Sequence, residues 1–299
     1  MPDDIPPLAP GLYLVATPIG NLGDITLRAL DVLRSVDRIA CEDTRQTQKL
    51  LNHFHIEKKT VSCHEHNELS RASELIHEIK RGSAVALVSD AGTPAVSDPG
   101  SRLVHEAIAA GVPVIPIPGA NAAVTSLVAS GLPTVEFQFL GFLPEKAGTR
   151  RTFLEKLAAM PRVTPQTIIF YEAPHRIRQT LSDIHALLGE CQICVGREIT
   201  KVHEEFIRGT VAEVRSTLAV RDRIRGEITL LIEAPALSGL SAGKPALSGA
   251  AEKISDQITR LKSESGIDEK EALKRLAREL DRSKSDLYRE LQRERAAKR

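Results

Sequence analysis

The sequence is poor in aromatic residues and carries almost no net charge. Only 3% of its 299 residues are aromatic, and tryptophan is absent. A nucleic-acid surface built mainly from stacking rings is therefore not expected. The formal charge of +1 argues against a surface that binds polyanions over its whole extent. Any contact with nucleic acid must be local.

Cysteine is also scarce, and its spacing does not predict a disulfide framework. Cys191 and Cys194 have the spacing of a redox motif, but they fall in a predicted strand, where positions three apart point to opposite faces. His64 and His66 could share a strand face, yet no second Cys/His pair stands at zinc-site spacing. We expect neither a redox centre nor a metal.

Long apolar runs are missing as well. No stretch approaches the roughly 18 residues of a membrane-spanning helix. The beginning of the chain is acidic and proline-rich and lacks the basic and apolar regions of a signal peptide. We therefore expect a cytoplasmic protein with a disordered segment over residues 1–11.

Several nucleotide and hydrolase signatures are absent. No G-x-G-x-x-G follows the first predicted strand, and the chain has no P-loop, so ordinary NAD or ATP binding has no support. A G-x-S-x-G elbow of serine hydrolases is missing too. These absences leave the polar turns of the chain as the features that indicate a site.

The stretch 84–100 is the central feature of the sequence. Residues 84–88 form an apolar, β-branched run typical of a buried strand, and a cluster of Ser, Asp, Gly, Thr and Pro then ends it. Asp98 and Pro99 predict the N-cap and first turn of a helix. A strand, a glycine-bearing turn and a helix in this order hold ligands in open α/β sheets.

Strands and helices alternate through the first part of the chain, which predicts a largely parallel sheet. A helix from Asn121 to Ser130 ends this part, and Gly131 to Pro133 predicts a hinge. The predicted strands are 12–16, 38–41, 60–63, 84–88 and 112–115.

A second α/β unit follows and is predicted to be more antiparallel, because several of its strands are close in sequence. Its predicted strands are 137–142, 167–171, 191–195, 205–208 and 227–233, and its predicted helices are 150–159, 174–188 and 211–219.

The end of the chain predicts a linker and a small helical module. Residues 235–250 are rich in Ala, Ser, Gly and Pro. Asp268 with Glu271, and Ser283 with Asp286, form two capping-box patterns that resemble a helix-turn-helix. Residues 251–299 hold 14 Lys and Arg against 11 Asp and Glu, an excess of three. This excess favours phosphate contact slightly over a solvated helix face.

The expected fold class is thus α/β with two domains, a parallel-sheet unit and a mixed-sheet unit, plus an all-α tail. The expected divisions are 1–11, 12–131, 132–234, 235–250 and 251–299.

Four polar turns stand at the carboxyl ends of predicted strands. The first three should converge at one edge of the first sheet, because the strands there run parallel. Their small residues let backbone groups approach a ligand closely. The turns suit a cofactor with adenine and ribose edges better than a bare phosphate, which would require more Lys or Arg. They are residues 17–20, 89–93, 119–122 and 171–174.

At these turns the sequence resembles a known family. Leu12-Tyr-Leu-Val-Ala-Thr-Pro-Ile-Gly-Asn and Val88-Ser-Asp-Ala-Gly-Thr-Pro are similar to motifs of the tetrapyrrole methylase superfamily. Other members carry Gly-Asp-Pro where this chain has Ser89-Asp90-Ala91, and this departure points to the branch that modifies small-subunit ribosomal RNA. The resemblance covers about residues 12–233, and the tail resembles the helix-turn-helix of that branch.

The resemblance implies a homodimeric methyltransferase that binds S-adenosylmethionine between its domains. It further implies methylation of the ribose 2′-hydroxyl of a cytidine in 16S ribosomal RNA near the decoding centre, within the assembled 30S particle. Asp90 is the strongest single candidate for the donor's amino group. By family position the expected cofactor-binding residues are Thr17, Pro18, Gly20, Ser89, Asp90, Ala91, Gly92, Thr93, Ser97, Asp98, Ala120, Ala122, Tyr171 and Thr229.

The proton acceptor is less well defined by the sequence. Lys201, Glu172 and Glu198 are the catalytic candidates, with Glu42, Asp43 and Glu204 as further carboxylates in polar turns; structural salt bridging is the alternative for each. The candidates for RNA phosphates are Arg45, Arg176, Arg197, Arg282, Lys284 and Arg289.

Two other functions remain open at this point. One is a tetrapyrrole C-methyltransferase of the same fold, to which a helix-turn-helix tail would be of no use. The other is a ligand-sensing DNA-binding regulator, against which the tail's small positive excess counts.

Overall fold

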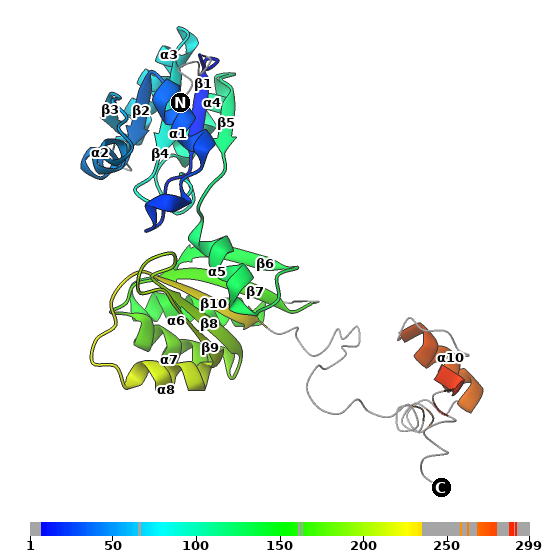
Figure 1. Ribbon diagram of the computed structural model, residues 1–299. Coiled ribbons are helices and arrows are strands. Elements are labelled where there is room, and N and C mark those ends of the chain that lie inside the picture. Colours follow the sequence, from blue (N-terminus) through cyan, green and yellow to red (C-terminus); the bar gives the residue numbers. More distant parts are fainter. Residues whose placement is uncertain are drawn as a thin grey trace. The chain divides into compact units, whose positions relative to one another are not determined.

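The computed structural model describes residues 7–64, 67–160, 162, 164–234, 258, 262, 268–279, 287–289 and 291 (Figure 1). The chain divides into two compact units, Met1–Ala236 and Leu237–Arg299. The predicted linker 235–250, Arg282 and Lys284 lie outside the described residues.

The first sheet is entirely parallel, as its alternating pattern predicts, and has the order β3-β2-β4-β1-β5. Its last strand is displaced from the predicted range 112–115 and begins two residues later. Pro116 lies within it, which an edge strand tolerates because one side of its backbone needs no ladder hydrogen bond. The strands are β1 (Gly11–Val15), β2 (Arg38–Cys41), β3 (Thr60–Ser62), β4 (Ala84–Val88) and β5 (Val114–Ile117).

Helices cover both faces of this sheet, because alternate strand residues point to opposite sides. Tyr13 and Ala86 pack in one core with α1 and α2, whereas Leu12 and Val85 pack in another with α3 and α4. The central strands β1 and β4 are therefore apolar on both faces, as expected for a parallel sheet. The helices are α1 (Leu27–Ser35), α2 (Thr44–His53), α3 (Glu68–Lys80) and α4 (Ser101–Ala109).

The start of α4 corrects a sequence prediction. Asp98 and Pro99 do not cap this helix, which begins at Ser101 after Gly100. The cap comes instead from Glu68 of α3, which is only 5% exposed. Its Oε1 accepts hydrogen bonds from the backbone N–H of Gly100 (3.0 Å), Arg102 (2.8 Å) and Leu103 (3.1 Å). A carboxylate distant in sequence thus satisfies the helix N-terminus and leaves Asp98 for another role.

We predict that Glu68→Ala lowers the free energy of unfolding by about 2–3 kcal/mol, because several buried N–H groups lose their acceptor. Urea denaturation of the full chain measures this change. Glu68→Gln, which keeps a carbonyl oxygen, should lose less than half as much. Equal losses for both variants would contradict the capping role.

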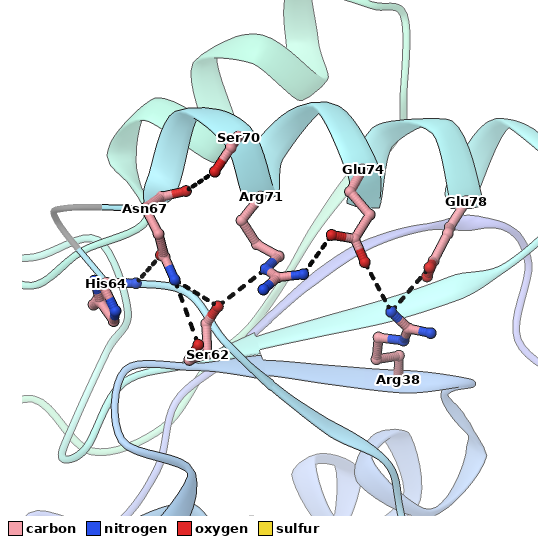
Figure 2. Close-up of polar contacts among 8 residues, drawn as sticks. All are labelled: Arg38, Ser62, His64, Asn67, Ser70, Arg71, Glu74 and Glu78. Atoms are coloured by element: carbon pink, nitrogen blue, oxygen red, sulfur yellow. Dashed lines mark hydrogen bonds and ion pairs between the residues drawn. The ribbon is translucent and has the colours of Figure 1, made fainter.

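The edge strand β3 is held by side chains from α3 (Figure 2). Asn67 accepts from the His64 N–H at 2.8 Å and donates to the Ser62 carbonyl at 3.3 Å, and Arg71 donates to the same carbonyl at 3.1 Å. Asn67 stands at the N-cap of α3, but its side chain binds the preceding turn instead of the helix. Arg38 of β2 adds ion pairs with two α3 carboxylates.

The second sheet is mixed, as predicted, with the order β6-β7-β10-β8-β9. Only β6 and β7 pair in parallel, and the other neighbours are antiparallel. Three helices, α6, α7 and α8, pack on one face. The elements are β6 (Phe137–Phe142), α6 (Ala147–Ala159), β7 (Gln166–Glu172), α7 (Ile177–Leu188), β8 (Gln192–Arg197), β9 (Glu205–Thr210), α8 (Val211–Ala219) and β10 (Ile228–Ala234).

Helix α5 (Ala122–Ser130) covers the other face of this second sheet (Figure 1). The predicted division after residue 131 groups this helix with the first sheet instead. Its Leu127 packs with Cys194 and Leu231, so the change from one sheet to the other comes before α5. Cys191 lies in the core of the opposite face, which confirms that the two cysteines point apart.

The tail unit contains α10 (Glu269–Glu279), and Asp268 caps it as predicted, accepting from the Glu271 N–H at 2.7 Å. Apolar side chains from α10 pack with Ile258, Leu287 and Leu291 in one small core. None of the helices in the described part of the chain is long and apolar enough to cross a membrane.

Candidate functional site

The unit Met1–Ala236 contains a cavity of about 370 Å³ at the carboxyl ends of the first sheet's central strands. The turns after β1, β4 and β5 contribute to its wall, so the predicted convergence of these turns is confirmed. Residues of the second sheet complete the wall. The lining residues are Ile19, Ala91, Gly92, Thr93, Val96, Ser97, Asp98, Asn121, Ala122, Phe142, Tyr171, Glu172, Ala173, Pro174, Ile199, Gly226, Glu227, Ile228 and Thr229.

Two turns are joined by a backbone bridge. Thr17 and Gly92 exchange N–H···O=C hydrogen bonds of 2.9 and 3.0 Å, and the Thr17 hydroxyl donates to the Ser89 carbonyl at 3.2 Å. The Ser89 hydroxyl in turn donates to the Gly92 carbonyl at 3.3 Å. Gly92 has φ of 84°, a conformation that suits glycine, and a Cβ there would lie 3.2 Å from Ile19. Thr17 and Ser89 do not line the cavity, but their hydrogen bonds hold together the turns that do.

The turn after β5 is held in the same way. Thr93 donates to the Ala120 carbonyl at 3.2 Å, and Asn121 donates to the Thr93 hydroxyl at 3.4 Å. The other end of the Asn121 amide caps α5 by accepting from the Val124 N–H at 3.1 Å. The cavity wall is therefore preformed on this side.

Asp98 is the carboxylic acid of the cavity whose protonation is most altered. Burial raises its pKa to about 6, and the nearby carboxylates of Glu42 and Asp90 act in the same direction. Ala95 and Ser97, just before it, have φ of 65° and 61°, which is unusual for non-glycine residues. Such backbone strain is concentrated at functional sites.

The second sheet supplies an aromatic wall. Tyr171 meets Phe139 and Phe142 in edge-to-face contacts, with ring centroids 4.9 and 5.6 Å apart. Burial raises the pKa of the Tyr171 hydroxyl, so this group stays protonated. Phe142 was not among the predicted site residues, although its position at the end of a predicted strand could have indicated it.

A lysine and two glutamates form an ion-pair cluster at one side of the cavity. Lys201 Nζ lies 2.9 Å from Glu198 Oε1 and 3.0 Å from Glu227 Oε2, and Glu227 lines the cavity. Burial lowers the pKa of Lys201, but the hydrogen bonds to both glutamates outweigh it and raise the pKa overall. Lys201 is consequently protonated near neutral pH. Its side chain covers Gly20, where a Cβ would lie 2.3 Å from Lys201 Cγ.

The chemistry of the wall restricts what the cavity can bind. Asp98 and Glu227 are acidic, Thr93, Ser97 and Thr229 carry hydroxyls, and no Lys or Arg is among the lining residues. A phosphate group would lack a cationic partner there. A ligand with positive charge, hydroxyls and an apolar edge is suited to it. In the described part of the chain, no group of three or more His, Cys, Asp or Glu side chains is arranged to hold a metal ion.

The predicted cofactor residues fall into two groups. Asp90 does not line the cavity; it is exposed, and its Oδ1 accepts from the Asp43 N–H at 3.2 Å. Those that line the cavity are Ala91, Gly92, Thr93, Ser97, Asp98, Ala122, Tyr171 and Thr229, and those that do not are Thr17, Pro18, Gly20, Ser89, Asp90 and Ala120.

Glu172 does not fit the catalytic expectation, because its carboxylate is already satisfied. Its side chain is 0% exposed and accepts from Arg176 at 2.5 and 2.7 Å, from Thr180 at 2.6 Å and from the Ala173 N–H at 2.7 Å. Three of these donors are on Oε1 and one is on Oε2, so this buried carboxylate is already bound within the second domain's own structure, which favours a structural role.

The predicted RNA-binding arginines are similarly occupied. Arg176 binds Glu172 and the Leu143 carbonyl, and Arg197 uses three nitrogens on Glu205 and two backbone carbonyls. These donors stabilise the second domain in this structure, and an RNA contact by either arginine stays a prediction. Arg45 is exposed and pairs with Asp43, and Arg289 is exposed in the tail unit.

Comparison with known proteins shows which family the chain is similar to. The family model for Tetrapyrrole (Corrin/Porphyrin) Methylases matches residues 11–215. The chain is 54% identical over 222 residues to "Ribosomal RNA small subunit methyltransferase I" of Halalkalibacterium halodurans, covering 74% of this chain and 75% of that protein. A protein of the same name from Synechocystis is 44% identical over 278 residues, covering 93% of this chain and 95% of its own length.

Solved structures share the fold at low sequence identity. Diphthine synthase superposes with a TM-score of 0.56 at 16% identity, covering 75% of this chain and 89% of its own. Uroporphyrin-III-C-methyltransferase from Thermus thermophilus gives a TM-score of 0.50 at 20% identity, covering 74% and 93%. These likenesses concern the fold alone.

Proposed function

The chain belongs to the tetrapyrrole methylase family, and we propose that it transfers the methyl group of S-adenosylmethionine to small-subunit ribosomal RNA. The observation that carries this proposal is the preformed cavity, whose acidic and hydroxyl-bearing lining suits a cationic donor. The names of relatives that are about half identical to this chain indicate the acceptor.

The finer substrate follows from the family resemblance. We propose the ribose 2′-hydroxyl of a cytidine in 16S RNA near the decoding centre, methylated in the cytoplasm by a homodimer acting on the assembled 30S particle. The similarity to the Synechocystis relative covers 93% of this chain and so reaches into the tail, which supports an RNA acceptor over a tetrapyrrole. A small-molecule methylase would have no use for a helical module of this kind.

The residues present fit S-adenosylmethionine. The donor carries a sulfonium cation, an amino group, ribose hydroxyls and an adenine ring, and supplies an electrophilic methyl group when bound. The carboxylates of Asp98 and Glu227 would offset the donor's positive charge. The hydroxyls of Thr93 and Thr229 would form hydrogen bonds with its ribose or adenine. Gly92, whose backbone carries no Cβ into the cavity, allows close approach.

Asp98 is the group we assign as proton acceptor. In such a transfer, the 2′-oxygen forms a bond to the methyl carbon while the carbon–sulfur bond breaks and a neutral thioether leaves. The hydroxyl must lose its proton, and a base with a pKa near the working pH is best suited to accept it. With a pKa of about 6, the carboxylate is mostly ionised at neutral pH and is more basic than an ordinary aspartate.

Lys201 is the positioning residue of the site. Its ammonium group holds Glu198 and Glu227 in place, and its raised pKa excludes the role of neutral base. Glu198 is likewise engaged, because its Oε1 accepts both from Lys201 and from the Glu227 N–H at 2.9 Å. Together they fix the side of the cavity formed by residues 226–229.

Incubation of the full chain with radiolabelled S-adenosylmethionine and unmethylated small ribosomal subunits tests the function. We expect label in 16S RNA, recovered as a 2′-O-methylated nucleoside whose phosphodiester resists alkaline cleavage. Assembled subunits should react faster than free 16S RNA, since little of the chain is built for reading single bases. Label only in an added uroporphyrinogen, or in no acceptor, would refute the proposal.

A further inference from the structure

A second groove, of about 520 Å³, adjoins the cavity and shares Pro174 and Gly226 with it. Unlike the cavity, this groove is basic. Arg178, Arg223 and Arg225 line it with one acidic residue, Asp222. Its remaining lining residues are His175 and Ile224.

The segment 221–226 that forms most of this groove has no regular secondary structure, yet it is held at both ends. Arg221 makes two hydrogen bonds to Glu205, of 2.5 and 2.8 Å, and its carbonyl accepts from Arg178. At the other end, the Arg225 carbonyl accepts from Arg197 at 3.2 Å. Three arginines thus use their donors to position this segment.

The segment's last residue fixes it against the cavity wall. Gly226 has φ of 90°, and a Cβ there would lie 2.4 Å from Glu198 Cγ. Residues 227–229, which line the cavity, follow directly. The basic groove is therefore rigidly placed at the cavity's rim.

The guanidinium groups of Arg223 and Arg225 are exposed and differ from these three. Within the residues that the structure describes, neither group makes a hydrogen bond or an ion pair. Two guanidinium groups with free donors, on a segment whose backbone is held, stand beside a cavity without lining cations and form a site for anions; their forked donors match phosphate oxygens.

We propose that this groove binds the phosphodiester backbone of the RNA strand next to the nucleotide that enters the cavity. The proposal rests on the function proposed above and names the part of the chain that holds its substrate. Arg223 and Arg225 bind phosphates, and Arg178, Arg197 and Arg221 position them. Arg197, one of the arginines expected to bind RNA, thus has a positioning role at this groove.

The test is salt-dependent binding of the full chain to small ribosomal subunits, with wild type and Arg223→Gln/Arg225→Gln compared by filter retention. We expect about tenfold weaker binding at physiological salt, and a slope of log affinity against log salt that is shallower by about 1.4. Calorimetry should show unchanged affinity for S-adenosylmethionine, because neither residue lines the cavity.

Lys80→Gln/Arg81→Gln is the matched control. It removes the same charge from two exposed residues at the end of α3, near the amino ends of the strands and so away from the cavity's edge. Equal binding by wild type and Arg223→Gln/Arg225→Gln would overturn the proposal. So would equal weakening in the control, because total charge would then explain the effect.

Methyl transfer by the wild-type chain tests the proposed function independently of the groove. If wild type binds subunits through the two arginines but transfers no methyl group, the groove stands and the proposed function fails. If wild type methylates 16S RNA and Arg223→Gln/Arg225→Gln does so with an unchanged KM, the groove fails and the function stands.

Discussion

Asp98→Asn is expected to lower the rate of methyl transfer by about 10²–10⁴-fold, the usual contribution of a positioned general base. The amide has nearly the same shape as the carboxylic acid but cannot accept the proton of the attacking hydroxyl. Initial rates with labelled donor and small ribosomal subunits measure the loss. Donor affinity, followed by calorimetry, should change far less than the rate.

Activity and stability are expected to change in opposite directions as the pH rises. Since the folded pKa of Asp98 is about 6, activity of the wild-type chain should rise as pH increases through 6 and the carboxylate ionises. Stability should move in the opposite direction. The unfolded chain releases this proton near pH 4, so the folded state binds more protons between about 4 and 6, and its stability falls as pH rises through that window.

Asp98→Asn should therefore be more stable than wild type above pH 6 and nearly equal to it below pH 4. Asp90→Asn is the control, because Asp90 is exposed and does not line the cavity. A rate for Asp98→Asn within about threefold of wild type, far below the usual contribution of a general base, would remove Asp98 from the mechanism.

Glu172→Ala is expected to lower the free energy of unfolding by about 3–5 kcal/mol. The substitution leaves Arg176, whose side chain is 13% exposed, without its ion-pair partner, and it removes the acceptor of Thr180. Urea denaturation monitored by circular dichroism measures the loss. The pH profile of methyl transfer by the remaining folded protein should keep its wild-type shape, because Glu172 does not take the proton.

Glu172→Gln is the control for this prediction. Its amide oxygen still accepts from Arg176, so it should lose less stability than the alanine variant. A shifted pH profile in Glu172→Gln together with wild-type stability would show that the carboxylate takes part in proton transfer.

Much of the architecture could be read from local patterns. Apolar runs of four or five residues separated by capped helices predict the parallel sheet, and the range 137–142 coincides with β6. The capping pair Asp268 and Glu271 correctly marks the start of α10. These features depend on residues within a few positions of one another, so the sequence contains the whole interaction.

The placement of α5 could not be read in this way. Its apolar residues would suit either sheet, and the glycine at 131 that ends the helix gives no information about its partner. Only the fit of Leu127 against Cys194 and Leu231 decides that it covers the second sheet. The cap of α4 has the same origin, since Glu68 lies more than thirty residues before the N–H groups that it binds.

For the site, the sequence by itself determined which turns meet and which family they resemble, because strand direction and small turn residues are local properties. The tertiary structure alone decided which charged groups are free. Arg176 and Arg197 bind carboxylates four and eight residues away and also the distant carbonyls of Leu143 and Arg225. Within the described residues, Arg223 and Arg225 make no such bonds. Desolvation of Asp98 likewise requires walls from both sheets, since a carboxylate's pKa depends on what surrounds it in space.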